Sequence, residues 1–138
     1  MFIDSSALVA ILIREEGYEK FLDKIEAFKG TRYISPLVRF EVTASFSRSL
    51  SGARRPTPEL FAEVTQLVNA TLEKLNVKEI TITPTIGAHA ITAAGEYGKI
   101  IGHKADLNFG DCFSYACAKA YHVSLIYKGN DFVETDLA

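Results

Sequence analysis

The sequence predicts an α/β fold in which helices cover both faces of a central parallel sheet. Short apolar runs of strand length alternate along the chain with longer segments whose apolar residues recur at helical spacing. Short, largely apolar strands that alternate with helices imply a parallel sheet covered on both faces. The first run passes directly into a helix, as expected where strands and helices alternate in layers.

The first half of the chain supplies two strands and four helices. Ser5-Ser6 suits a helix N-terminus directly after the first strand. Gly17 and Gly30 bound a second helical pattern, and Pro36 suits the first turn of a third helix. The expected elements are a strand at 2–3, helices at 7–12 and 17–30, a strand at 32–35, and helices at 36–50 and 57–72.

The second half continues the same alternation. The segment 98–110 contains three glycines and is the least regular part, so it is expected to be a loop. The run Val123 to Tyr127 has the apolar character of a buried strand. The expected elements are a strand at 77–82, a helix at 85–97, the loop at 98–110, a helix at 111–121 and a strand at 123–127.

Length and composition predict one domain over residues 1–138. The chain is 48% hydrophobic, enough for one proper core, and no apolar run approaches the ~20 residues of a membrane-spanning helix. The start of the chain lacks the pattern of a secretory signal, so we expect a cytoplasmic protein. Cys112 and Cys117 have neither disulfide nor zinc-knuckle spacing and are expected to be buried thiols. The net charge of −2 argues against the broad basic surface of an indiscriminate nucleic-acid binder, but not against a basic rim around an acidic centre.

Four acidic residues follow predicted strands or begin a helix near them. Asp4 directly follows the first strand, Asp131 follows the last one, and Glu41 lies just over one helical turn beyond the strand at 32–35. Asp111 begins a helix after the irregular loop. Because ligands of parallel α/β sheets bind beyond the carboxyl ends of the strands, we expect these four side chains to share one edge.

Three of these acids also have an ordinary structural explanation. Asp4 and Asp111 stand where an acidic side chain stabilises a helix N-terminus, and Asp131 lies in a Gly-Asn-Asp turn. Any one of them taken alone would not indicate a functional site.

Glu41 is the more informative position. Its neighbours at three and four residues' distance are apolar or small, whereas Arg39 and Thr43 lie on nearly the opposite side of the helix. Glu41 is therefore expected to face inward. A buried carboxylate must be protonated, paired with a cation or bound to a metal, and the local sequence offers no inward-facing Lys or Arg.

Converging carboxylates repel one another, and a divalent cation with hard oxygen ligands relieves that repulsion. The set favours Mg²⁺ or Mn²⁺ over zinc, because His89, His103 and His122 lack zinc-site spacing. Such centres serve phosphodiester cleavage, in which the metal activates water. Ser6 could add a hydroxyl to this centre, and its place at a helix start explains it equally well.

Four motifs of the chain resemble the VapC family of PIN-domain toxins. They are the segment 2–12, which begins Phe-Ile-Asp-Ser-Ser, Phe-Glu-Val at 40–42, the segment 107–119, which begins Leu-Asn-Phe-Gly-Asp, and the segment 127–137, which begins Tyr-Lys-Gly-Asn-Asp-Phe. The resemblance spans the whole chain in the same order. It implies a three-layer α/β/α PIN fold and an endoribonuclease acting as the toxin of a type II toxin–antitoxin pair. It also implies inhibition by a VapB antitoxin whose tail blocks the site, and assembly as a homodimer.

The resemblance assigns roles residue by residue. Asp4 and Asp111 match the family's principal metal ligands, Glu41 matches the acid on the third helix, and Asp131 matches the less constant acid of the closing Asp-Phe motif. The closing loop varies in the family, so Asn130 or Asp136 could share or take the role of Asp131. The usual Asp-Thr-Ser after the first strand is Asp-Ser-Ser here, which keeps the hydroxyls.

The same resemblance implies that basic residues contact RNA phosphates and that an antitoxin binds at the acids. An antitoxin would insert a basic side chain toward the acids and lay an apolar helix along a groove. Most of these basic residues are better explained as solvent-exposed charges, and His103, which could touch phosphate, is better explained as an ordinary polar residue. The candidates for phosphate contacts are Arg14, Arg39, Arg48, Arg54, Arg55, Lys99 and Lys104.

Two other classes of protein fit the sequence less well. A haloacid-dehalogenase-like phosphatase would use Asp4 as a nucleophile, but it needs Asp-x-Asp and Ser6 stands at the second position. A non-catalytic module that binds RNA or protein would not need four intact acids. A dinucleotide or P-loop fold is excluded because no glycine-rich loop follows the first strand.

Overall fold

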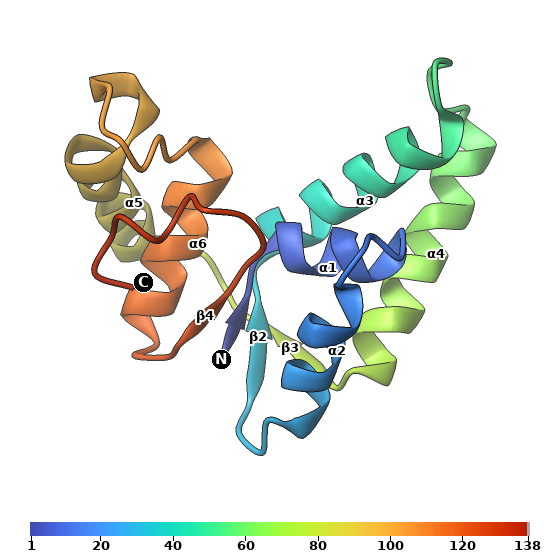
Figure 1. Ribbon diagram of the computed structural model, residues 1–138, viewed down its shortest axis with the longest axis horizontal. Helices are drawn as coiled ribbons and strands as arrows, with labels where there is room; N and C mark the ends of the chain where they lie inside the picture. Colours follow the sequence, from blue (N-terminus) through green and yellow to red (C-terminus); the bar gives the residue numbers. More distant parts are fainter. Residues whose placement is uncertain (138) are drawn as a thin grey trace.

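The computed structural model describes residues 1–137 and contains a sheet of four parallel strands in the order β3-β2-β1-β4 (Figure 1). The predicted α/β class with a central parallel sheet is confirmed. The strands are β1 (Phe2–Ile3), β2 (Arg32–Ile34), β3 (Val77–Glu79) and β4 (Leu125–Ile126).

β1 has the predicted bounds, whereas β2, β3 and β4 are shorter than the runs predicted at 32–35, 77–82 and 123–127. β2 ends at Ile34 because Ser35 caps the following helix. The amide of Ile80 bonds to the carbonyl of Ile34, and beyond this point β2 offers β3 no further backbone to pair with. β1 stops after Ile3 because Asp4 caps the following helix. Short strands bring the acidic residues that follow them close to the edge of the sheet.

Six α-helices and one short 3₁₀ helix connect and cover the strands within the described residues. Three helices start with proline after a hydroxyl residue, and the side chains of Ser35, Thr57 and Thr83 each accept a hydrogen bond from a first-turn amide. The helices are α1 (Ser5–Leu12), α2 (Tyr18–Ala27), α3 (Pro36–Ser51), α4 (Pro58–Lys74), α5 (Pro84–Tyr97), η1 (Lys99–Ile101) and α6 (Phe109–Ala120).

The strand order places a change of winding direction between β1 and β4. The chain steps outward from β1 to β2 to β3, then returns through α5 and α6 to place β4 on the other side of β1. Figure 1 shows α5 and α6 together on one side of the sheet and α1 to α4 on the other. In such sheets, the crevice at the carboxyl ends of the two strands flanking this point is where ligands bind.

The buried apolar side chains form one cluster that extends from Met1 to Phe132. β1 lies at its centre, with Phe2 and Ile3 both fully buried. Cys112 and Cys117 are buried free thiols, as predicted. None of the helices within residues 1–137 combines the length and the apolar character needed to cross a membrane.

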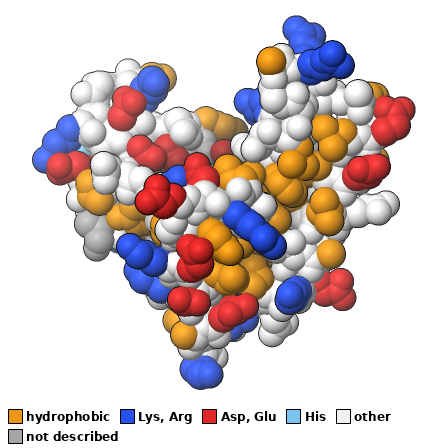
Figure 2. All heavy atoms as spheres, turned by 45° about the vertical axis from the view of Figure 1, so that its right-hand side comes forward, with side chains coloured by type: hydrophobic (Ala, Val, Ile, Leu, Met, Phe, Trp, Pro, Cys, Tyr) orange, Lys and Arg blue, Asp and Glu red, His pale blue; other side chains and the backbone are white. Residues whose placement is uncertain are grey.

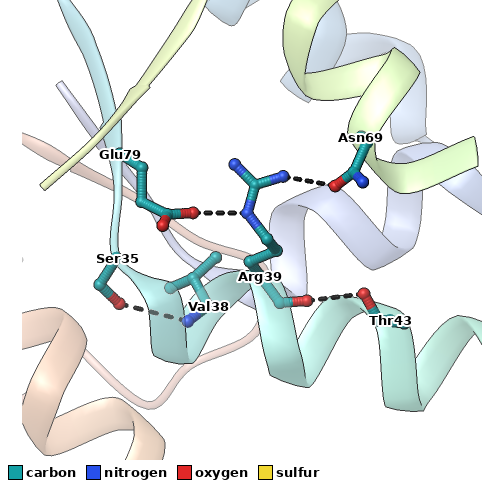
Figure 3. A network of polar contacts seen from close by, with 6 residues as sticks. All are labelled: Ser35, Val38, Arg39, Thr43, Asn69 and Glu79. Carbon is teal, nitrogen blue, oxygen red and sulfur yellow. Dashed lines mark hydrogen bonds and ion pairs between the residues drawn. The ribbon is translucent and has the colours of Figure 1, made fainter. Parts of the chain in front are cut away.

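Arg39 fixes α3 against its neighbours on the side away from Glu41. Figure 3 shows the Arg39 guanidinium between Glu79, at the end of β3, and Asn69 on α4, with 2.6 Å between Arg39 Nη1 and Asn69 Oδ1. Thr43 is buried, and its hydroxyl donates to the carbonyl of Arg39. The side of α3 that was expected to be polar therefore packs against the end of β3 and α4. The guanidinium of Arg39 is bonded to Glu79 and Asn69.

Candidate active site

Asp4 is buried at the carboxyl end of β1, with 3% of its surface exposed. Its Oδ2 caps α1 by accepting hydrogen bonds from the amide of Ser6 at 2.9 Å and the hydroxyl of Ser6 at 2.6 Å. The same hydroxyl accepts a bond from the amide of Lys128, just beyond β4, at 3.0 Å. Ser6 thus holds the Asp4 carboxylate and ties the ends of β1 and β4 together.

Asp111 occupies the first turn of α6 rather than its first position, which corrects the predicted helix start. Asn108 is the N-cap, and its side chain accepts a bond from the amide of Asp111 at 3.0 Å. The carboxylate of Asp111 in turn accepts a bond from the amide of Asn108 at 2.9 Å. This reciprocal capping box aims the Asp111 carboxylate past the helix N-terminus.

Glu41 extends from α3 to the start of α6, where its carboxylate lies against Gly110. A Cβ on Gly110 would lie only 2.3 Å from Glu41 Oε2. Glu41 Oε1 is buried and has no hydrogen-bond partner within residues 1–137. The inward orientation expected for Glu41 is observed, and no Lys or Arg in the described chain forms an ion pair with it.

The charges of these acids act on one another. Burial, assisted by the negative charges of Asp4 and Asp111, raises the pKa of Glu41 to about 7. Burial also raises the pKa of Asp111 to about 6, opposed by the amide of Asn108 and assisted by the charges of Asp4, Asp131 and Asp106. Three elements distant in sequence therefore bring Asp4, Glu41 and Asp111 together in one acidic centre.

The structure separates the two acids of the closing segment. Asp131 is exposed, and its charge acts on Asp111. Asp136 instead accepts hydrogen bonds from Tyr115 Oη and Lys119 Nζ, both at 2.7 Å. Lys119 lies two turns beyond Asp111 on α6, about 12 Å along the helix axis. Asp136 is therefore engaged away from the acidic centre.

Asn108 and Gly110 belong to a motif noted in the sequence, but their roles in this centre were not predicted. Asn108 stands three positions before Asp111, a spacing that could have indicated the capping box. Gly110 leaves the room that Glu41 fills, and nothing in a single sequence distinguishes such a glycine from any other helical glycine. Within residues 1–137, no three His, Cys, Asp or Glu side chains stand in an arrangement that would hold a metal ion as they are.

The neighbouring basic loop is largely engaged in its own structure. Lys104 pairs with Glu134, and Lys99 lies 3.8 Å from Asp106. The ring of His103 accepts a hydrogen bond at Nδ1 from the amide of Ala105 and packs edge-on against Tyr97. The role of His103 is that of a loop residue.

A doubly wound parallel sheet with acids gathered where its winding reverses is the architecture of a PIN-like domain. The family model described as "PIN domain" matches residues 1–137, and the chain belongs to the PIN-domain family. Within that family it belongs with the VapC proteins, which confirms the resemblance stated from the sequence. A VapC ribonuclease of Rhizobium meliloti (strain 1021) is 42% identical to this chain over 99% of the chain and 98% of the relative.

Other similar proteins agree with this placement. Ribonuclease VapC30 of Mycobacterium tuberculosis (strain H37Rv) is 34% identical over 100% of this chain and 96% of its own length. The crystal structure of Mycobacterium tuberculosis VapC20, titled a sarcin-ricin loop cleaving toxin, has a TM-score of 0.73 at 14% identity, covering 99% of this chain and 95% of that one. A toxin-antitoxin complex from Klebsiella pneumoniae has a TM-score of 0.69 at 18% identity, covering 98% and 92%. At these identities, the two structures support the fold alone.

Proposed function

We propose that this protein is a metal-dependent endoribonuclease and the toxin of a VapBC-type toxin–antitoxin pair. The observation that carries the proposal is the state of Glu41. One of its carboxylate oxygens is buried without a hydrogen-bond partner in residues 1–137, and its pKa is raised by burial and by two neighbouring acids. The names of the VapC relatives support ribonuclease activity. RNA is present in the cytoplasm, which is where such a toxin would act.

The acidic centre fits a hard divalent cation, Mg²⁺ or Mn²⁺. Its donors are carboxylate oxygens, and burial together with their mutual repulsion raises the pKa values of Glu41 and Asp111, which a bound cation would reverse. Asp4, Glu41 and Asp111 would hold the ion, with Asp131 at the exposed side of the centre. Because no three acidic side chains within residues 1–137 stand in a metal-holding arrangement as they are, small shifts of these side chains would accompany binding. The ion would supply Lewis acidity that activates water and offsets charge on the phosphate.

The protein's own residues would divide the remaining work. Ser6 fixes the orientation of Asp4, and Asn108 fixes that of Asp111, so both acids are positioned before substrate arrives. Without a metal the pKa of Glu41 is about 7, so binding of the ion by this carboxylate would release a proton near neutral pH. The phosphatase alternative needs a second acid two positions after Asp4. Ser6 stands at that position and orients Asp4 instead.

The proposed partners are RNA, a VapB-type antitoxin and a second copy of the chain. An antitoxin is supported by the toxin-antitoxin complex among the structural neighbours and by the acidic centre, which would attract a basic side chain. For the homodimer, the best-suited face is an apolar hollow of about 890 Å³ between α5, η1 and α6. Ile91, Ile100 and Phe109 are 77%, 86% and 69% exposed on this face, a gathering of apolar surface typical of interfaces. A higher assembly would form when antitoxin joins the dimer.

The test is cleavage of total RNA by purified protein with and without Mg²⁺ or Mn²⁺. We expect discrete fragments that disappear with EDTA and fall by on the order of 10²-fold or more in Asp4→Asn, Glu41→Gln and Asp111→Asn. Asp23→Asn, an exposed acid on α2, is the matched control and should cut like the wild type. Metal-independent cleavage, or full activity in the three variants, would overturn the proposal. RNA binding without cleavage would indicate a non-catalytic module.

A further inference from the structure

The turn between α3 and α4 carries a concentration of positive charge at the end of the arm formed by these two helices. Arg48, Arg54 and Arg55 are all exposed there, and we call these three residues the basic tip. No acidic residue occurs between Glu41 and Glu59. Figure 2 shows basic side chains at the end of the arm, which projects from the body of the molecule. This stands out in a chain whose net charge is −2.

The basic tip is not neutralised by the rest of the molecule. Across residues 1–137, the ion pairs involve Arg39, Lys99, Lys104, Lys119 and Lys128, and none involves an arginine of the tip. The exposed lysines of α2 provide a contrast, because Glu19, Asp23 and Glu26 are interspersed among them. Unpaired like charges held near one another repel, so the tip is suited to an anionic partner.

The tip lies in line with the acidic centre. Glu41 and Arg48 are seven residues apart on α3, which is two turns, so both side chains leave the same face of the helix. The distance along the axis is about 10 Å, and Ala44 and Ser45 between them are small. About three nucleotides of a stacked single strand, at ~3.4 Å each, cover that distance. A strand with one phosphate at the acidic centre could therefore follow this face of α3 to the tip.

We propose that the basic tip binds the sugar-phosphate backbone of RNA a few nucleotides from the cleaved bond. The inference rests on the proposed nuclease function and adds a substrate-positioning surface to it. Guanidinium groups bind phosphate through paired hydrogen bonds, which hold a strand in register without selecting its sequence. The surface also resolves a difficulty of the acidic centre, whose carboxylates repel the phosphates that they must receive. Positive charge beside the centre offsets that repulsion.

Binding can be measured separately from cleavage. The probe is a labelled, mixed-sequence single-stranded RNA of about 20 nucleotides, longer than the ~4–16 that a single-strand-binding fold covers. Fluorescence anisotropy is recorded in EDTA, where the proposed metal-dependent cleavage cannot occur. The test variant is Arg48→Gln/Arg54→Gln/Arg55→Gln. The control is Lys20→Gln/Lys24→Gln/Lys29→Gln on and beside α2, which removes the same charge from another exposed surface.

We expect the tip variant to bind on the order of tenfold more weakly, and the slope of log K against log salt to fall by about 2, at ~0.7 for each lost phosphate contact. The control should change neither quantity by a comparable amount. With Mg²⁺ or Mn²⁺ present, the tip variant should show a raised KM and an unchanged kcat, because the tip does not touch the reacting atoms.

Equal losses in the tip variant and the control would overturn the inference, since only net charge would then matter. An unchanged slope of log K against log salt in the tip variant would also overturn the inference. If the variant bound RNA normally and instead lost binding to an acidic protein, the basic tip would be a protein-binding surface. The two proposals can fail separately. If the wild type showed no metal-dependent cleavage, the proposed nuclease function would be wrong. The anisotropy measurement in EDTA would still report whether RNA binds the basic tip.

Discussion

The carboxylate of Glu41 lies directly over Gly110, so that α3 reaches the acidic centre only because α6 has no side chain at that point. A Cβ on Gly110 would lie 2.3 Å from Glu41 Oε2 and 2.8 Å from Oε1, well inside contact distance. Gly110→Ala should therefore displace Glu41 while leaving Asp4 and Asp111 in place. Since a misplacement of ~1 Å can cost about 10²-fold in rate, we expect RNA cleavage to fall by that order.

A matched control separates this displacement from a general effect of alanine. Gly95 lies on α5, and a Cβ added there would meet nothing within 4 Å. Gly95→Ala should leave cleavage unchanged and stabilise the protein by roughly 0.5–1 kcal/mol through helix propensity. Thermal melts and cleavage rates of both variants test this pair. Full activity in Gly110→Ala would show that the position of Glu41 does not matter.

Stability without metal should rise as the pH falls from about 8 to about 5.5. Glu41 and Asp111 have folded pKa values of about 7 and about 6, above their ordinary values of 4.5 and 3.8. As the pH falls through the folded values, the folded protein takes up protons that the unfolded chain does not, which stabilises it. Melting in EDTA should thus occur at higher temperature at the lower pH.

Two comparisons assign this effect to the acidic centre. Glu41→Gln removes one of the two titrating groups and should reduce the pH dependence while raising the melting temperature near pH 8. Saturating Mg²⁺ or Mn²⁺ near pH 8 should also raise the melting temperature of the wild type, because the ion binds the folded state alone. A melting temperature in EDTA that rises toward alkaline pH over this window would contradict the assignment.

Asp131 and Asp136 should respond differently to the same substitution. Asp131→Asn should lower cleavage with little change in melting temperature, because Asp131 is exposed and its charge acts on Asp111. Asp136→Asn should weaken the bonds to Tyr115 and Lys119 and loosen the C-terminal segment from α6. Lys119 and Tyr115 lower the pKa of Asp136, so its contribution to stability is present above the ordinary carboxyl pKa and is lost as the pH falls toward the lowered value.

Limited proteolysis of the C-terminal segment, run beside cleavage assays, distinguishes the two variants. Faster proteolysis is expected for Asp136→Asn alone. If Asp136→Asn removed cleavage with no change in proteolysis or melting temperature, Asp136 rather than Asp131 would be the fourth residue of the site.

Arg32 should be important for stability and not for activity. Its guanidinium donates to the carbonyl of Leu75 at 2.8 Å, and to those of Glu26 and Phe28 at 3.1 and 3.0 Å. It thereby satisfies carbonyls at the C-terminal ends of both α2 and α4. Arg32→Met should cost about 1–3 kcal/mol and lower the melting temperature by several degrees, with cleavage unchanged below the transition. Lys29→Met, an exposed neighbour, should leave both unchanged.

The apolar face of α5, η1 and α6 should determine the oligomeric state. Ile100 is 86% exposed at this face, so Ile100→Glu should not disturb the core. If two copies pack through this face, the variant should be monomeric in light scattering at concentrations where the wild type is a dimer. Leu67→Glu, at a 52% exposed position on α4, is the control for adding a charge elsewhere. A dimer that survives Ile100→Glu would place the interface on another surface.

The helices were largely predictable from local signals, and the strand lengths were not. The hydroxyl-proline starts of α3 and α4 and the glycines around α2 mark helix ends by chemistry that neighbours in sequence supply. β3 and β4 were predicted as 77–82 and 123–127, but the strands extend only over Val77–Glu79 and Leu125–Ile126. The length of a paired strand depends on where its partner strand ends, and the residues of the strand itself do not specify this. The start of α6 was predicted at Asp111, but the helix begins at Phe109 because Asn108 is its N-cap.

The sequence by itself determined the alternation of strands and helices, the family and the acids that stand after strands, because each of these is encoded in short stretches of neighbouring residues. Tertiary structure alone decided that β4 lies beside β1, that Glu41 rests on Gly110, and that Asp136 is drawn to Tyr115 and Lys119 while Asp131 remains near Asp111. These outcomes depend on which distant segments pack together and on how burial changes the free energy of a charge. Both are properties of the folded chain and not of any one segment.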